Sequence, residues 1–215
     1  MAIREVAPPK RSVGFRMTAL VLAVLAVGVG ISLMISARLG VSPADAMTTG
    51  GAERLGIGVG TFGWISGAVI TTIAWLMGRP PQWGTLWGTF LVGVSVNVCL
   101  PLLSEPDAMA WRVAMFVLGL IVLYVAIAVG VATTLGTGPI ELLMLALSDR
   151  GVSVQVARWA IEALVVVIGL ILGGQIGVGT LIFVVLTGPV LARLMPLTER
   201  FMGTSVVVRP TGLDA

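Results

Sequence analysis

The chain has 215 residues, of which 57% are hydrophobic and 11% are charged, and its net charge is +3. Soluble domains average about 25% charged residues, so the composition predicts a membrane protein with one membrane domain. The sequence has no histidine and one cysteine. This excludes zinc sites built from those residues and catalytic triads with a histidine base. We therefore expect no enzyme activity, metal or cofactor. The cations are not clustered, so we expect no binding of nucleic acid.

Six segments are long and apolar enough to cross the hydrocarbon core of a bilayer as helices. They span roughly 15–37, 57–77, 85–103, 113–134, 157–173 and 177–195. The first segment exceeds twenty residues, which is longer than the apolar region of a signal peptide, so we interpret it as a retained span.

The two halves of the chain share one pattern of glycines, prolines and charges. LGVSPAD at 39–45 returns as LGTGPIE at 135–141, at an offset of 96 residues. Leu55 has no partner, and the match continues beyond it at an offset of 95. Residues paired in this way include Arg16/Arg112, Glu53/Asp149, Arg54/Arg150, Gly56/Gly151, Trp64/Trp159, Gly78/Gly173, Thr85/Thr180 and Gly93/Gly188. The pattern predicts two repeats, 15–103 and 111–197, with three spans each.

Charge distribution predicts the orientation in the membrane. With a cytoplasmic N-terminus, ten Lys and Arg residues fall inside and three fall outside, as the positive-inside rule favours. Both termini then lie in the cytoplasm. An odd number of spans per repeat gives the repeats opposite orientations, an arrangement found in many secondary transporters. We expect the polar tails, 1–14 and 203–215, to be disordered and cytoplasmic.

A short helix is predicted between the first and second spans of each repeat. In the first repeat Ser42 is the N-cap, Pro43 is at N1 and Asp45 is at N3. About eleven residues rise about 16 Å, half the thickness of a bilayer, so each helix lies in the interface or enters the membrane and returns. The residues predicted to form these turns and caps are Gly40, Ser42, Pro43, Arg54, Gly136, Gly138, Pro139 and Arg150.

Four polar side chains are candidates for binding a substrate or an ion. Asp45 and Glu141 either bind a cation, an amine or a proton, or only cap their own helices. Glu162 lies inside the fifth span, where it either pairs with Arg158 or forms a proton or cation site. Asn97, in the third span, is the fourth candidate, and it is also suited to an interhelical hydrogen bond.

The LGxxPx(D/E) turn, the GxGT start of the third span and the LGTGP turn together resemble the bacterial YczE/YyaS/YitT group of membrane proteins. The resemblance covers about 15–197 and implies a protein of the bacterial cytoplasmic membrane, with no settled biochemical activity. The second turn in that group is nearer GTGPRDGLM. Here Ile140, Glu141 and Leu142 stand in its place, which removes a cation and keeps an acid.

The expected fold is therefore an all-α polytopic membrane protein with two inverted three-helix repeats, each carrying a short half-helix. The function that this pattern favours is a transporter or permease for a small solute or ion. The alternative is a membrane accessory protein that does not transport and binds a partner. The lipid bilayer, a small solute or cation, and a second copy of the chain are the partners that we consider.

Overall fold

A computed structural model describes residues 11–204, and every regular element in that part of the chain is helical. The helices are α1 (Val13–Ala37), α2 (Pro43–Leu55), α3 (Val59–Leu76), α4 (Trp83–Cys99), the 3-10 turn η1 (Leu100–Leu102), α5 (Met109–Ala132), α6 (Pro139–Ser148), α7 (Val154–Leu172) and α8 (Val178–Met202). Six of them are long and apolar enough to cross a membrane. The prediction of an all-α polytopic membrane protein is confirmed.

The six long helices coincide with the predicted spans to within a few residues, except at the end of the last one. Helix α1 begins at Val13 because the Ser12 hydroxyl accepts the backbone N–H of Phe15. Helix α8 continues past Pro196 and ends at Met202, seven residues beyond the predicted end of the span, with Gly203 as its C-cap. The tails were predicted to be disordered, and residues 1–10 and 205–215 lie outside the described part of the chain.

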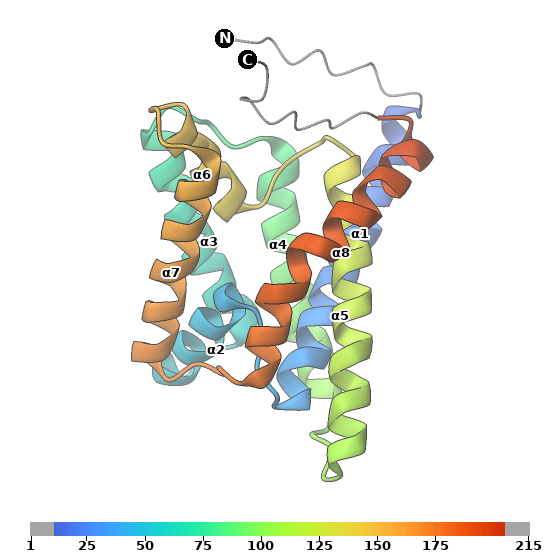
Figure 1. The fold of residues 1–215 in the computed structure, drawn as a ribbon, viewed down its shortest axis with the longest axis vertical. Coiled ribbons are helices and arrows are strands. Elements are labelled where there is room, and N and C mark those ends of the chain that lie inside the picture. The colour runs from blue at the N-terminus through green and yellow to red at the C-terminus, as the bar shows by residue number, and fades with distance from the viewer. Residues whose placement is uncertain (1–10, 205–215) are drawn as a thin grey trace.

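The two short helices lie at opposite ends of the molecule (Figure 1). Helix α2 has 13 residues and α6 has 10, so they rise about 20 Å and about 15 Å and cannot cross a core about 30 Å thick. Both begin with proline at the first helical position. The ring of Pro139, the first residue of α6, lies near Gly67, halfway along α3. Helix α6 therefore begins within the membrane-spanning layer.

The helices pack as two groups. In the long-helix group, α1 packs against α4 and α5, and α5 packs against α8. In the short-helix group, α2 and α6 each pack against both α3 and α7. The main helix contact between the groups joins α3 to α4. Helices α7 and α8, by contrast, diverge from the short turn that joins them (Figure 1).

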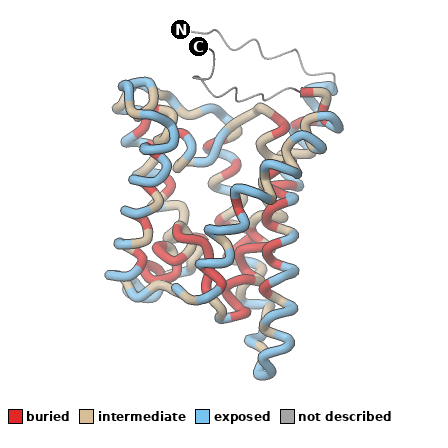
Figure 2. The backbone as a smooth tube through the Cα atoms, in the orientation of Figure 1, coloured by how far each residue is buried: buried red, intermediate tan, exposed pale blue. Residues whose placement is uncertain are grey.

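The buried residues concentrate around α2 and the neighbouring ends of the long helices, in the half of the molecule away from the described chain ends (Figure 2). Met34, Ala37 and Val41 are completely buried there, in an apolar cluster that also includes residues of α4 and α5. Toward the described chain ends the structure is more open, and much of α7 and α8 is exposed. The two ends of the membrane domain are therefore packed unequally.

The backbone turns repeat at the positions that the sequence pattern pairs. Among the described residues, only Arg38 (φ 54°) and Thr134 (φ 56°) combine a side chain with a positive φ, and they are partners at the offset of 96. Gly56 and Gly151 (φ 64° and 89°), which end the short helices, are partners at the offset of 95. A left-handed residue reverses the chain after each helix, and the pattern places it alike in both halves.

Candidate functional site

The N-terminus of α2 carries the first acidic candidate. The Asp45 carboxylate accepts a hydrogen bond from the Ser42 hydroxyl at 2.5 Å, and the Asp45 backbone N–H donates to the same hydroxyl at 3.2 Å. The carboxyl is half-buried, and none of the described cations forms an ion pair with it. Burial raises its pKa from 3.8 to about 6, against the opposing effect of the Ser42 hydrogen bond. Helix α2 lies outside the six spans. The raised pKa follows from burial of a carboxylate that has no described cation beside it.

Replacing Asp45 by Asn is expected to remove a pH dependence of stability. The pKa of Asp45 is higher in the folded protein than its ordinary value. Its contribution to the free energy of unfolding is therefore fully present below about pH 4 and is lost as pH rises through about 6. The loss is of order 1–3 kcal/mol. Melting temperatures of purified wild type and D45N in detergent, measured from pH 4 to pH 7, check this. The melting temperature of D45N should rise relative to that of the wild type as pH rises. Parallel curves of melting temperature against pH would contradict the burial of this carboxyl.

The second acidic candidate, Glu141, lies at the start of α6. Its side chain folds back over its own N-cap, since a side chain built on Gly138 would collide with a Glu141 carboxylate oxygen. Gly138 has no side chain to cap the helix, and no side-chain hydrogen bond caps this end of α6. Glu141 is exposed on the protein surface, unlike Asp45. The two acids thus have different surroundings despite their equivalent places in the sequence.

The third candidate, Glu162, forms an ion pair on α7, where its carboxylate accepts a hydrogen bond from Arg158 Nε at 2.9 Å. Sequence reasoning did not single out Gln155, and it noted Trp159 as the repeat partner of Trp64. Both are exposed and share a helix face with Glu162, because residues spaced by four and then three positions align along one side of a helix. The spacing was visible in the sequence. Helix α7 therefore carries a polar face within a span.

Asn97 makes a structural contact between α3 and α4. Its side-chain oxygen accepts the backbone N–H of Gly60 at 2.9 Å, and its amide donates to the Thr61 hydroxyl at 3.0 Å. The N-cap of α3, Gly58, has no side chain to satisfy the free N–H groups of the first turn. Asn97 supplies that cap from the neighbouring helix.

The structure relates the three acids to one another but not to Asn97. Ala44, Ile140 and Ile161, which are sequence neighbours of Asp45, Glu141 and Glu162, all belong to one apolar cluster. That cluster includes residues of α2, α3, α6 and α7, so it is the centre of the short-helix group. The acids lie on three different helices, each next in sequence to a residue of this cluster. No hydrogen bond or ion pair within residues 11–204 joins them.

The glycine turns of each half contact the start of the third span of the other half. The Leu39 carbonyl accepts the backbone N–H of Gly179 at 2.7 Å. The equivalent residues, Leu135 and Gly84, also meet, because a side chain on Gly84 would collide with the Leu135 carbonyl oxygen. Such close backbone approach requires glycine at these positions. These contacts fasten the two halves of the chain together.

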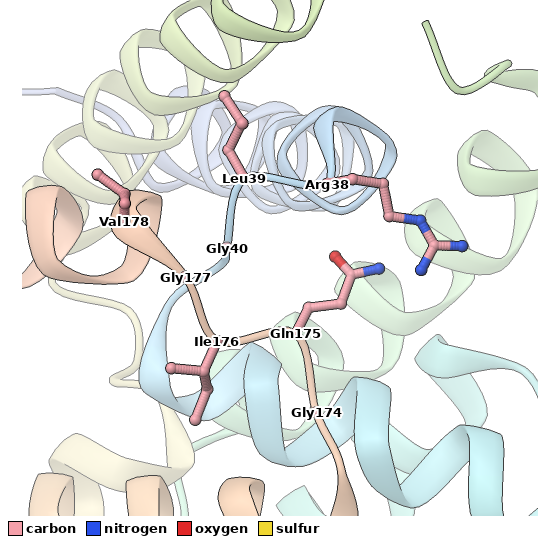
Figure 3. Close-up of a pocket in the computed structure, with 8 residues that line it drawn as sticks. All are labelled: Arg38, Leu39, Gly40, Gly174, Gln175, Ile176, Gly177 and Val178. Carbon is pink, nitrogen blue, oxygen red and sulfur yellow. The ribbon is translucent and has the colours of Figure 1, made fainter. Parts of the chain in front are cut away.

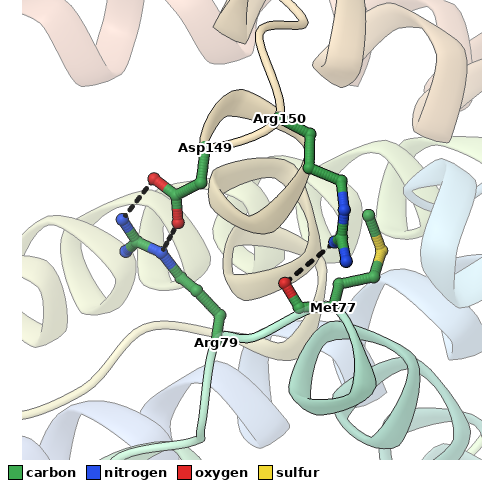
Figure 4. Close-up of polar contacts among 4 residues, drawn as sticks. All are labelled: Met77, Arg79, Asp149 and Arg150. Carbon is green, nitrogen blue, oxygen red and sulfur yellow. Dashed lines mark hydrogen bonds and ion pairs between the residues drawn. The ribbon is translucent and has the colours of Figure 1, made fainter.

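The arginines that end the short helices cap helices other than their own. Arg54 donates to the carbonyls of Ile171 and Leu172 at the end of α7, at 2.5 Å and 3.2 Å. Its partner Arg150 donates to the Met77 carbonyl at the end of α3, at 2.8 Å (Figure 4). Both arginines satisfy carbonyls that have no partner within their helix. Each half therefore completes a helix of the other half.

An ion pair between the two halves lies beside Arg150, and the residues at the equivalent positions cannot form it. The Arg79 guanidinium donates two hydrogen bonds to Asp149, at 2.6 Å and 3.0 Å (Figure 4). Hydrogen bonding to Arg79 lowers the pKa of Asp149. The residue that corresponds to Arg79 in the second half is Gly174, so the pair forms at only one end of the molecule.

A cavity of about 380 Å³ lies at the opposite end, between the turn after α1 and the α7–α8 turn. The Gln175 side chain points toward Arg38 across it (Figure 3). Oriented to satisfy both neighbours, the Gln175 amide accepts from Arg38 at 2.9 Å and donates to the Ile35 carbonyl at 3.1 Å. Arg38 also donates to Glu105 at 2.7 Å, which lowers the pKa of that acid. Arg38 thus joins α1 to two loops, a role that sequence reasoning missed because the partners are distant in sequence.

The amino-acid sequence of this chain is similar to those of known proteins. A family model described as a family of unknown function, DUF6198, matches residues 14–196. The uncharacterized membrane protein YczE of Bacillus subtilis is 31% identical over 192 residues, covering 86% of this chain and 88% of its own length. The uncharacterized protein YyaS of the same organism is 30% identical over 186 residues, covering 83% and 92%.

An uncharacterized protein of Haemophilus influenzae is 26% identical over 186 residues, covering 84% of each chain. No solved structure matches. The resemblance to YczE and YyaS that the turns predict is confirmed, and the six apolar helices fit the description of YczE as a membrane protein. The chain is an integral membrane protein that belongs to the DUF6198 family of unknown function.

Proposed function

We propose that the protein is a small transporter, built from two inverted repeats, that moves protons or small cations across the bacterial cytoplasmic membrane. The observation that carries the proposal is that each half of the chain caps a helix of the other half. Arg54 caps α7 and Arg150 caps α3, while the two short helices lie at opposite ends. A twofold axis in the membrane plane relates contacts in this way, and it is common in secondary transporters with broken helices.

The proposed orientation has both termini in the cytoplasm. Arg16 and Arg11 lie near the described N-terminus, and the Arg11 side chain donates to the Phe201 carbonyl near the end of α8. Arg79 follows α3 and Arg150 follows α6, and these two helices finish at the same end of the molecule as α8 (Figure 1). Cations concentrated at one end favour the cytoplasmic side.

The acids favour a cation as the transported species. Asp45, Glu141 and Glu162 are each next in sequence to a residue of the apolar cluster that joins the broken segments. Glu162 lies within a span, where an ionisable group is costly and commonly functional. Asp45 has no cationic partner in the described structure, and its pKa of about 6 suits proton exchange. Arg158 sits beside Glu162, so cation binding there would compete with the ion pair.

Reconstitution in liposomes tests the proposal directly. Proton flux is followed with entrapped pyranine under a valinomycin-clamped potassium potential, and methylammonium uptake is measured with radiolabel. We expect the wild type to exceed empty liposomes for at least one of these probes. D45N and E162Q should lose at least tenfold of that flux, because they remove the charges that attract a cation or carry the proton.

The matched control is E53Q, which neutralises an exposed acid at the far end of α2. It should retain flux within about twofold, since it lies away from the apolar cluster. A wild type that is no faster than empty liposomes for both probes would reject transport of protons and small cations. That result would favour the alternative of an accessory protein that binds a partner.

A further inference from the structure

The α3–α4 pair and the α7–α8 pair have equivalent sequences but different packing. Gly93 is buried, and a side chain there would collide with the Trp64 indole and lie 2.8 Å from the Gly60 carbonyl oxygen. Its partner Gly188 is exposed, and no described atom beyond its chain neighbours and the nearby backbone of its own helix lies within 4 Å of the place its side chain would occupy. Trp64 donates to the Phe90 carbonyl at 3.0 Å, whereas Trp159 is 62% exposed. The first pair is closed and the second is open.

Asn97 holds the closed pair together, and the open pair lacks an equivalent. The residues that correspond to Asn97 and Thr61 are Ala192 and Val156, which cannot form the hydrogen bond. Gly60 corresponds to Gln155, which is exposed. Interhelical hydrogen bonds of polar residues stabilise helix pairs in membranes. The sequence difference between the repeats therefore favours closure of α3–α4 over closure of α7–α8.

We propose that the two pairs exchange conformations. In a second state, α7–α8 closes through Gly188 and Trp159 while α3–α4 opens. The hydrogen bonds of Asn97 to Gly60 and Thr61, here called the latch, set the balance between the two states. The inference rests on the proposed transport function, because inverted repeats that swap conformations give alternating access. Gly188 and Trp159 recur in the second repeat without a packing role in the described state, and the second state gives them that role.

The two states open the protein toward opposite sides of the membrane. The α7–α8 turn lies at the end away from the described chain ends, so the open pair diverges toward the end where α1 begins and α8 finishes (Figure 1). In this state Gln155 and Trp159 are exposed, and Glu162 on the same helix face is partly exposed. Glu162 corresponds to Gly67, which is buried against Thr89 of α4, so the equivalent closure covers Glu162 with α8. With cytoplasmic termini, the described state faces inward.

Two matched cysteine pairs report the two states. In a C99A background, T61C with N97C replaces side chains that touch in the described state. This pair also removes the latch, so it is the positive control for cross-linking across a closed pair and does not measure the effect of Asn97. The equivalent pair, V156C with A192C, joins α7 to α8 only in the second state. We expect a short bifunctional thiol reagent to cross-link the first pair rapidly in membranes and the second pair slowly.

Releasing the latch should accelerate the second cross-link. Adding N97A to the 156/192 pair should raise its rate by about threefold to tenfold, the range expected for one or two interhelical hydrogen bonds. T61V keeps the side-chain shape and removes one of the bonds, so it should give a smaller increase. T72V, on the same helix but outside the latch, is the control and should leave the rate unchanged.

Two results would overturn the inference. If the 156/192 pair never cross-links in N97A or T61V while the 61/97 pair does, the second state does not exist. If it cross-links equally fast in all backgrounds, Asn97 is not a latch. The experiment needs no transported solute, so exchange without flux in liposomes would reject cation transport and leave the two-state inference standing.

Discussion

Replacing Gly93 by Ala is expected to destabilise the protein by about 1–3 kcal/mol, the usual cost of overpacking a closed helix contact. The added methyl group would collide with the Trp64 indole and press on Gly60, and the Trp64 bond to the Phe90 carbonyl would be lost. Thermal aggregation of the detergent-purified protein, followed by size-exclusion chromatography, measures the change in melting temperature.

The chain supplies its own matched control for this variant. G188A makes the same substitution at the equivalent place in the second repeat, where the added methyl group would meet no described atom of another helix within 4 Å. It should change the melting temperature little, and the small gain in helix propensity of Ala over Gly favours stability. Equal destabilisation by both variants would mean that α7–α8 is packed as closely as α3–α4.

Thiol labelling from the two sides of the membrane is expected to give opposite results for the two short helices. In a C99A background, L55C marks the end of α2 and D149C follows the end of α6. Both positions are exposed. A membrane-impermeant maleimide should label L55C from the outside and D149C only when it reaches the inside, because inverted repeats place equivalent ends on opposite faces.

F201C serves as the reference for this labelling. Phe201 is 59% exposed near the end of α8, at the same end of the molecule as Asp149. It should therefore be labelled from the same side as D149C. Labelling of L55C and D149C from one face would reject the inverted arrangement, and with it the proposed mechanism of transport.

The packing asymmetry changes how the acidic candidates are compared. Asp45 and Glu141 occupy equivalent positions, yet Asp45 is half-buried and Glu141 is exposed. The tighter end of the molecule surrounds α2, and the open end surrounds α6. Under the proposed exchange the two acids would swap surroundings, so the burial of each would depend on the state of the protein. Glu162 has no equivalent acid and would be alternately exposed and covered.

Much of the local structure was predictable from the sequence. The six spans and two short helices follow from local chemistry, because a bilayer forces each apolar segment of about 20 residues to satisfy its backbone within a helix. Ser42 and Pro43 start α2 where predicted, and Gly56 ends it, because capping depends on residues a few positions apart. The sequence pattern also paired the positive-φ turns, including Arg38 with Thr134.

Only the tertiary structure decided which surfaces meet. An apolar helix face packs equally well on lipid or on another helix, so hydropathy does not distinguish the closed pair α3–α4 from the open pair α7–α8. The arginines at the ends of the short helices carry the charge expected for their own dipoles, yet they bond to carbonyls of α7 and α3, more than seventy positions away. Repeated residues determine which contacts are available to each half. The packing of the whole chain decides which half makes them.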